Sequence, residues 1–281
     1  MHVPLYFNGR YTTTAERVLG VEDRGFQFGD GIYEVVKFQN KRPLFASEHL
    51  ERMSRGLTAL EIPVPLERNA WLEVFGELIE RSGESDGTLY LQVTRGETAR
   101  TTLYPADHPT TVVAYARGMA FPSREAKVAG ISAVTVPDLR WSRCDIKSVN
   151  LLGSVLARQE ARRNGAAEAL LLRENVYTEG AHSNVFFLLD GVIVTHPANE
   201  RILRGTVRTQ VLRIARETGL KVAERPLLRE ELDLVSEAFI TSTSQGVMPL
   251  RTLDGLSLGS NATSLKLGDL YAELEQRLAT E

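Results

Sequence analysis

Short β-type runs alternate with amphipathic helical stretches along the whole chain, and tight-turn signals join several of these runs. One such signal is Asn8-Gly9, which lies between two runs rich in aromatic residues and is a dipeptide that two-residue hairpins favour. Hairpins join antiparallel strands, whereas strands that alternate with helices favour parallel pairing. The pattern therefore predicts an α/β fold whose sheets are mixed rather than purely parallel.

The 281 residues correspond to about two domains of roughly 150 residues each. The regular pattern breaks at Gly118–Ser123, where glycine and proline interrupt the β-type runs. We therefore expect a smaller N-terminal α/β domain over residues 1–117, an interdomain linker over 118–123 and a larger C-terminal α/β domain over 124–281.

Local signals predict the main elements of both halves. The glycine-rich segment 23–31 is expected to be a structural loop that delivers Tyr33 near the start of a strand, and Ser47 is expected to cap the helix that follows. Further strands are expected at 89–93, 111–115, 131–136, 169–172, 185–189 and 238–241, and further helices at 66–81, 151–164, 205–218 and from 264 onwards.

Charge and cysteine content limit the classes of partner and the cellular compartment that we expect for this chain. The chain has 33 basic and 36 acidic residues, a net charge of −3, so no basic field favours nucleic acid or a membrane surface. No stretch approaches the ~20 apolar residues of a membrane span, and the start does not resemble a signal peptide. The single cysteine, Cys144, cannot form an internal disulfide, which favours the cytoplasm. Small molecules and proteins are the expected partners.

Three residue types with distinct chemistry occur in separate motifs. Lys147 precedes an apolar helical run, Glu179 precedes a β-type run, and Arg52 follows His49 on a predicted helix. Pyridoxal phosphate (PLP) requires an amine for its Schiff base, an anion beside its ring nitrogen and a cation for its phosphate. The five histidines include no i,i+4 pair, so we expect no metal site of the helical zinc type.

The motifs that contain these residues resemble those of class IV aminotransferases, and most closely those of D-amino-acid aminotransferases. The resemblance rests on Arg24–Glu34, Asp145–Leu152, Thr178–Gly180 and Ser183–Phe186, in the family's order and over essentially the whole chain. It implies the two-domain fold type IV of PLP-dependent enzymes, with PLP between the domains, and a homodimer in which each subunit completes its partner's site.

The resemblance also implies roles for individual residues. Lys147 would carry PLP as a Schiff base and, as a neutral amine, move the proton between the substrate Cα and the cofactor. Glu179 would face the ring nitrogen. The phosphate would be bound by the Arg52 side chain, the Thr206 and Val207 backbone amides, and the Thr243 hydroxyl.

Tyr33 and Arg100 would bind the substrate carboxylate, with Arg100 reaching across from the neighbouring subunit. This chain departs from the family where a histidine partner of Arg100 is replaced by Thr102, which supplies no positive charge. Gly205–Arg208 has Thr206-Val207 where the family has Ile-Thr, which removes one hydroxyl near the phosphate. His182 replaces a family serine, and either contacts substrate or the cofactor loop or is a surface turn residue.

The leading hypothesis is transfer of an amino group from a D-amino acid to a 2-oxo acid in two half-reactions. A branched-chain L-amino-acid aminotransferase is the nearest alternative, although the tyrosine expected after Asn150 in that group is absent. Transamination of (R)-amines, suggested by Thr102, and an aminodeoxychorismate lyase remain open on the same fold. A binding module without catalysis is disfavoured because Lys147 is present.

Overall fold

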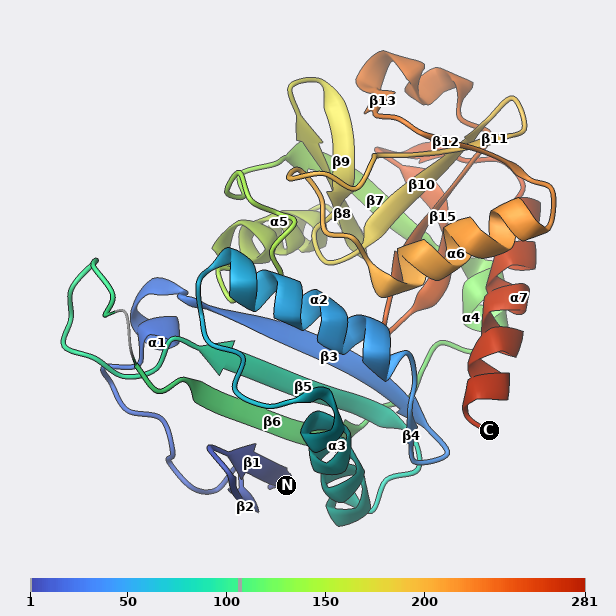
Figure 1. The fold of residues 1–281 in the computed structure, drawn as a ribbon. Helices are drawn as coiled ribbons and strands as arrows, with labels where there is room; N and C mark the ends of the chain where they lie inside the picture. Colours follow the sequence, from blue (N-terminus) through green and yellow to red (C-terminus); the bar gives the residue numbers. More distant parts are fainter. Residues whose placement is uncertain (1, 106–107, 281) are drawn as a thin grey trace. The chain divides into compact units, whose positions relative to one another are not determined.

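The computed structural model describes residues 2–105 and 108–280, which divide into two compact units (Figure 1). The first unit comprises 1–120, 146–150 and 276–281, and the second comprises 121–145 and 151–275. The change of unit after residue 120 falls within the linker expected at 118–123. The segment 146–150, which contains Lys147, clusters with the first unit although it follows this linker in the sequence.

The first unit is built on a six-stranded sheet with the order β2-β1-β6-β5-β3-β4. Its strands are β1 (Pro4–Phe7), β2 (Arg10–Thr13), β3 (Gly31–Gln39), β4 (Arg42–Pro43), β5 (Gly87–Thr94) and β6 (Thr111–Gly118). The Asn8-Gly9 hairpin is confirmed: both residues have positive φ and join antiparallel β1 and β2. Every pair of this sheet in the described residues is antiparallel, so the expected mixed pairing is wrong for this unit.

Three helices accompany this sheet, namely α1 (Arg24–Phe28), α2 (Ala46–Ala59) and α3 (Arg68–Ser82). The expected loop at 23–31 is wrong because Asp23 caps a short helix there, accepting hydrogen bonds from the amides of Gly25 and Phe26. Ser47 is not the cap of α2, since the helix begins one residue earlier and Phe45 occupies the cap position.

One face of the first sheet packs against helices. Along β5, Leu89, Leu91 and Val93 are fully buried, while the intervening residues are more exposed, which is the period of two expected for a strand. Figure 1 shows α2 lying along β3, on the side to which Glu34 contributes its buried side chain. Tyr33 belongs to the opposite face of the strand by the same alternation.

The second unit is built on a mixed sheet with the order β12-β11-β10-β14-β15-β7-β8-β9-β13, to which β16 adds beside β15. Parallel pairs join β7 to β8, β7 to β15 and β11 to β12, which confirms the expected mixed pairing here. Its strands are β7 (Ile131–Pro137), β8 (Glu168–Arg173), β9 (Val176–Gly180), β10 (Asn184–Leu189), β11 (Val192–Thr195), β12 (Lys221–Glu224), β13 (Leu227–Leu228), β14 (Glu237–Ser242), β15 (Gly246–Leu253) and β16 (Leu256–Ser257).

Helices surround this second sheet. They are α4 (Arg124–Ala129), α5 (Leu152–Arg163), α6 (Thr206–Glu217), the 3-10 helix η1 (Arg229–Leu234) and α7 (Ala262–Leu278). The expected helix from Gly205 to about Thr218 is confirmed, because these residues cap the two ends of α6. The expected strands did not include several of those observed, namely β4, β9, β11, β12, β13, β15 and β16. Among these, β9 contains Glu179, which was expected only to precede a strand.

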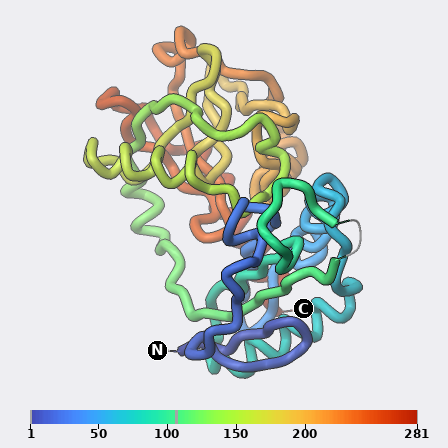
Figure 2. Tube along the Cα trace, turned by 90° about the vertical axis from the view of Figure 1, so that its left-hand side faces the viewer, coloured from blue at the N-terminus to red at the C-terminus, as the bar shows by residue number. Residues whose placement is uncertain are grey.

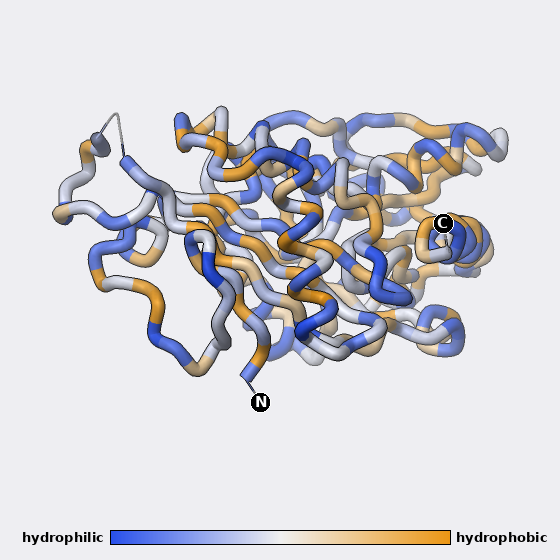
Figure 3. The backbone as a smooth tube through the Cα atoms, turned by 60° about the horizontal axis from the view of Figure 1, so that its bottom comes forward, coloured by the Kyte–Doolittle hydropathy of each residue, from blue (hydrophilic) through white to orange (hydrophobic). Residues whose placement is uncertain are grey.

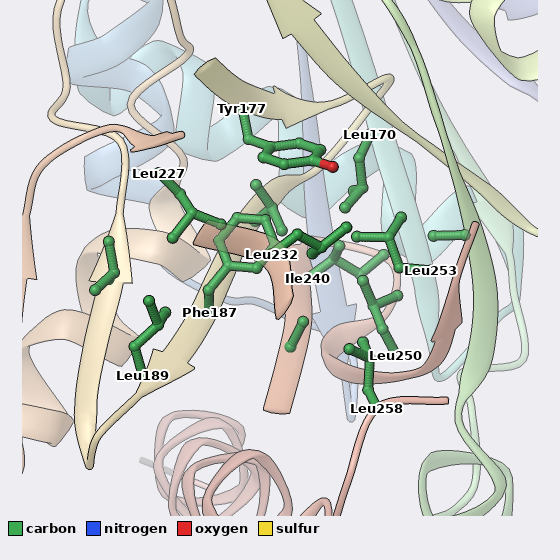
Figure 4. Packing of buried hydrophobic residues seen from close by; sticks show 14 of the residues in the cluster. Leu170, Tyr177, Phe187, Leu189, Leu227, Leu232, Ile240, Leu250, Leu253 and Leu258 are labelled. Atoms are coloured by element: carbon green, nitrogen blue, oxygen red, sulfur yellow. The ribbon is translucent and has the colours of Figure 1, made fainter. Parts of the chain in front are cut away.

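The core of the second unit gathers side chains from several strands (Figure 4). Leu170, Tyr177, Phe187, Ile240 and Leu250 are almost fully buried and come from β8, β9, β10, β14 and β15. Hydrophobic and hydrophilic residues alternate along the helices and strands, as Figure 3 shows by colour. Packing of these strands fixes the positions of β9 and β10, which carry the polar residues described below.

Figure 2 follows the Cα trace from the first strands in blue to α7 in red. Within the described parts of the chain, none of the helices combines the length and the apolar character that crossing a membrane requires.

Candidate active site

Lys147 lies in a short segment that pairs with the beginning of β3. The amide of Tyr33 donates to the Lys147 carbonyl at 3.0 Å, and the amide of Val149 donates to the Gly31 carbonyl at 3.0 Å. An antiparallel bridge joins Ser148 to Ile32 between these bonds. Because β5 occupies the other edge of β3, this segment continues the sheet on the edge that β4 covers further along. The lysine backbone is therefore fixed to the sheet.

The Lys147 amine lies over the ring of Tyr33, with Nζ 4.2 Å from the ring centroid. Tyr33 stacks on Tyr90, and Tyr90 stacks on Tyr115, with centroids 5.8 and 5.1 Å apart. These tyrosines come from the neighbouring strands β3, β5 and β6, so cross-strand stacking holds Tyr33 in place. Two residues predicted from the sequence, Lys147 and Tyr33, are thus brought together within one unit.

A buried carboxylate orients the predicted phosphate-binding arginine. Arg52 donates through Nε to Oε1 of Glu34 and through Nη2 to Oε2, both at 2.7 Å. Nδ1 of His49 lies 2.8 Å from the same Oε2. All three side chains are at least nine-tenths buried, so this bidentate pair holds the guanidinium in a fixed orientation.

Burial and neighbouring charges shift the pKa values in this cluster. Burial alone would raise the pKa of Glu34, but the charge and hydrogen bonds of Arg52, together with His49, outweigh it and lower the pKa below its usual range. Burial lowers the pKa of His49, and the nearby Arg52 and Lys147 charges act in the same direction. The cluster therefore holds the ion pair of Arg52 with Glu34 beside a buried imidazole that resists protonation.

Arg100 lies against α1 rather than beside the tyrosine stack. Its guanidinium stacks on the Phe28 ring at 4.8 Å and donates to Gln27 Oε1 at 3.4 Å. Arg24 stacks on the same ring, also at 4.8 Å, and donates to the Thr101 carbonyl at 2.7 Å. The segment that carries Arg100 is therefore anchored on α1. Its substrate role stays a prediction.

In the second unit, Glu179 has a partner for each carboxylate oxygen. Asn184 Nδ2 donates to Oε2 at 2.8 Å, and the Leu203 amide donates to both oxygens at 3.1 Å. Arg140 donates to Oε1 through Nη1. Only 4% of Glu179 is exposed, and this burial raises the pKa of its carboxyl even though the Arg140 charge opposes the shift.

Arg140 is itself held by a second carboxylate. It donates to both oxygens of Asp138 at 2.9 Å, and Asp138 also pairs with Arg173 at 3.1 Å. Arg140 and Arg173 thus neutralise the two carboxylates of Asp138 and Glu179. Neither Arg140 nor Asp138 was predicted from the sequence, because they lie about 40 residues from Glu179 and no local motif links them to it.

The N-terminus of α6 offers a cradle for an anion. Gly205 has no side chain to cap the helix, so the first turn leaves backbone N–H groups of Thr206 and Val207 without an intrahelical acceptor. A Cβ at Gly205 would overlap with Oδ1 of Asn184, so only glycine allows this close approach. Asn184 is also paired with Thr241 in the sheet, which places β14 beside the cradle.

The end of β14 carries hydroxyl groups that lack protein partners. Thr241 Oγ1 and Ser242 Oγ are buried and have no hydrogen-bond partner among the described residues. Buried hydroxyls without a partner are uncommon in folded proteins and call for an explanation. Thr243 follows them in the turn that leads to β15. Its side-chain role stays a prediction.

His182 uses both ring nitrogens within the protein. Nδ1 lies 2.9 Å from Oε2 of Glu168, and Nε2 lies 2.8 Å from Nη1 of Arg158. Both contacts are made to residues of the second unit. The substrate-binding role expected for His182 stays a prediction.

A sequence profile of the family described as amino-transferase class IV matches residues 31–253. The chain belongs to this family. The match spans β3 with Tyr33 and Glu34, the Lys147 segment, Glu179 and the start of α6, so the family assignment covers the residues of both units described above.

Individual aminotransferases are similar to this chain over nearly its whole length. The D-alanine aminotransferase of Bacillus licheniformis is 38% identical over 98% of this chain and 97% of its own length. The D-alanine aminotransferase of Listeria monocytogenes is 35% identical over 98% and 94%. Among solved structures, the branched-chain amino acid aminotransferase of Escherichia coli has a TM-score of 0.91 at 25% identity, covering 98% of this chain and 95% of that one.

The same fold also occurs in a putative 4-amino-4-deoxychorismate lyase of Legionella pneumophila, with a TM-score of 0.83 and 21% identity over 93% of this chain and 97% of that one. This likeness concerns the fold alone. The fold type expected from the sequence is confirmed by these structures.

Class IV aminotransferases use PLP, and the residues of this class IV chain fit that group. The buried hydroxyls of Thr241 and Ser242 and the open cradle at Gly205 suit a phosphate. Within the second unit Glu179 would offer a buried carboxylate to a protonated ring nitrogen, and within the first unit Lys147 would offer the amine. Glu34 was present in the quoted motif without an assigned role; its helix-facing position on β3 was the signal that could have linked it to Arg52.

Proposed function

We propose that this class IV aminotransferase is a PLP-dependent transaminase that transfers the amino group of a D-amino acid to a 2-oxo acid. The observation that carries the proposal is the position of Lys147, whose backbone is paired with β3 and whose amine lies over Tyr33. The two D-alanine aminotransferases that match nearly the whole chain support D-amino acids as substrates.

The predicted cofactor-binding residues have separate tasks in this proposal. Arg52, oriented by Glu34, binds the phosphate together with the Thr206 and Val207 amides and the Thr243 hydroxyl. Glu179 keeps the ring nitrogen protonated. When bound, PLP supplies an electron sink for the negative charge that develops at the substrate Cα.

Lys147 is the catalytic base. Its neutral amine would take the proton from the substrate Cα and pass it to the bound cofactor. The rigid backbone pairing with β3 limits where Nζ can reach, and so selects the face of the substrate from which the proton leaves.

Tyr33 and Arg100 bind the substrate carboxylate. Tyr33 stands beside the Lys147 amine, and its stacking on Tyr90 restricts the phenol to one orientation. Arg100 sits on a segment anchored to α1, so we assign it to the site of the neighbouring subunit in a cytoplasmic homodimer.

A branched-chain L-amino-acid aminotransferase is the second candidate, favoured by the fold match to the Escherichia coli enzyme. Turnover with D-alanine and with L-leucine, each with 2-oxoglutarate as acceptor, separates the two. We expect D-alanine to be preferred at least 100-fold in kcat/KM. A preference for L-leucine would move the chain to the second candidate. (R)-1-phenylethylamine, a donor without a carboxylate, tests the alternative of (R)-amine transamination.

A further inference from the structure

The short connection between β9 and β10 joins Glu179 to Asn184, two residues of the second unit's site. β9 ends at Gly180 and β10 begins at Asn184, so only three residues join the strands. Glu179 and Asn184 flank this connection and are hydrogen-bonded to each other at 2.8 Å. A change in the connection therefore displaces both the carboxylate and the amide that supports it.

A buried carboxylate on β8 anchors this connection. Oε2 of Glu168 accepts a hydrogen bond from Ser183 Oγ at 2.9 Å and lies 2.9 Å from Nδ1 of His182. Oε1 accepts from the Ala169 amide at 2.9 Å. Glu168 is fully buried, so it needs these donors to offset the loss of water.

His182 has a partner on each side of its ring. A guanidinium can only donate, so Arg158 Nη1 donates to Nε2 of His182. Nδ1, on the other side of the ring, donates to Oε2 of Glu168. The imidazole therefore bridges an exposed arginine of α5 and a buried glutamate of β8.

We propose that His182 is a positioning residue for Glu179: it ties the β9–β10 connection to Glu168 and Arg158 and so keeps the carboxylate at the PLP ring nitrogen. The proposal rests on the proposed function for the part that concerns PLP. The serine that the family has at this position has one hydroxyl on a short side chain and cannot span both partners.

The contacts of His182 with Glu168 and Arg158, called the tie below, can be tested by amide hydrogen exchange in the protein without cofactor. The Gly180 amide donates to the Ser183 carbonyl at 2.7 Å and the Ala181 amide to the Ala169 carbonyl at 2.9 Å, so both report on the connection. In His182→Ala we expect both amides to exchange at least 10-fold faster. His182→Asn, which keeps an amide donor for Glu168, should stay within about threefold of the parent.

Arg158→Ala tests the other end of the bridge, with Arg162→Ala on the exposed side of the same helix as the matched control. We expect faster exchange of the two amides in Arg158→Ala and parent rates in Arg162→Ala. Parent exchange rates in both His182→Ala and Arg158→Ala would overturn the proposal.

The second readout is the PLP dissociation constant of each apoprotein, followed by quenching of tryptophan fluorescence. His182→Ala should bind PLP about 10-fold more weakly, and His182→Asn should recover most of the affinity. Faster exchange with unchanged PLP affinity would show that the tie does not act on Glu179 and would also overturn the assignment. A parent protein that binds no PLP would instead refute the proposed function, while the exchange rates would still decide whether the tie exists.

Discussion

Lys147 is the residue on which the proposed chemistry depends. Lys147→Arg places a guanidinium over Tyr33 in the place of the nucleophilic amine, so we expect D-alanine turnover to fall by about 10³-fold or more. Thermal unfolding is the control, and the melting temperature should stay close to that of the parent. Turnover within 10-fold of the parent would contradict the catalytic assignment.

Arg140 stabilises two buried carboxylates at once, those of Asp138 and Glu179. Arg140→Met would leave Glu179 without its paired cation and Asp138 with Arg173 alone, so we expect the free energy of unfolding to fall by about 3–5 kcal/mol. Arg163→Met is the matched control, because the pair of Arg163 with Glu160 is exposed and its loss should cost below about 0.5 kcal/mol. Equal denaturation midpoints for both variants would contradict this account.

At the residue scale the sequence motifs predicted Lys147, Tyr33, Arg52 and Glu179, because each lies in a local pattern. Their supporting partners could not be predicted in this way. Arg140 is 39 residues from Glu179, and Glu34 is 18 residues from Arg52. Only the folded arrangement of strands and helices makes these residues neighbours.

At the element scale, the start of α6 provides the clearest test of phosphate binding. Gly205→Ala would place a methyl group against Asn184 and close the approach to the Thr206 and Val207 amides. The φ of −64° suits alanine, so the effect comes from lost space rather than from backbone strain. We expect PLP affinity to fall at least 10-fold, measured by titration of the apoprotein.

Gly76→Ala is the matched control for this substitution. Gly76 lies within α3, and a Cβ there would meet no other atom within 4 Å. Alanine should stabilise the helix by about 0.5–1 kcal/mol and leave PLP affinity unchanged. If both alanine variants bind PLP as the parent does, the cradle is not the phosphate site.

The helices and strands with a clear period were predictable, and the exceptions have physical causes. The glycine-rich segment 23–31 indicated a loop, but Asp23 supplies acceptors for the first amides of α1 and so favours a helix. β9 was missed because it holds only five residues and its side chains are mostly buried, which removes the alternating pattern. The pairing of the Lys147 segment with β3 joins residues that are distant in sequence.

At the scale of the whole molecule, acid should destabilise the protein through the buried groups of the first unit. The pKa of Glu34 is lowered in the folded state, so its stabilisation is complete above the unfolded value of about 4.3 and is lost below it. The pKa of His49 is also lowered, by burial, so the unfolded chain takes up this proton first as the pH falls through about 6.5.

We therefore expect stability to fall from pH 7 to pH 5, by up to about 1.4 kcal/mol per pH unit for the His49 proton. His49→Gln, which keeps a donor for Glu34, should flatten this part of the profile. Chemical denaturation at several pH values measures the slope. A variant slope equal to that of the parent would contradict the neutral, buried state of His49.

The expected homodimer can be tested on α5. Leu152, Val155 and Leu156 are all more than half exposed, and their spacing places them on one face of the helix. We expect this face to contact the second copy, so Leu156→Glu should shift the mass measured by light scattering from dimer towards monomer. Lys221→Glu, at an exposed position of β12, is the control. A parent protein that is monomeric would contradict the homodimer.

D-Amino-acid transamination is tested by the absorbance spectrum of the PLP-reconstituted protein before and after addition of D-alanine alone, with L-leucine in a parallel cuvette. We expect D-alanine to bleach the visible band of the bound cofactor and to produce the band of pyridoxamine phosphate, while L-leucine leaves the spectrum nearly unchanged. A response to L-leucine alone, or no visible band after reconstitution, would contradict D-amino-acid transamination.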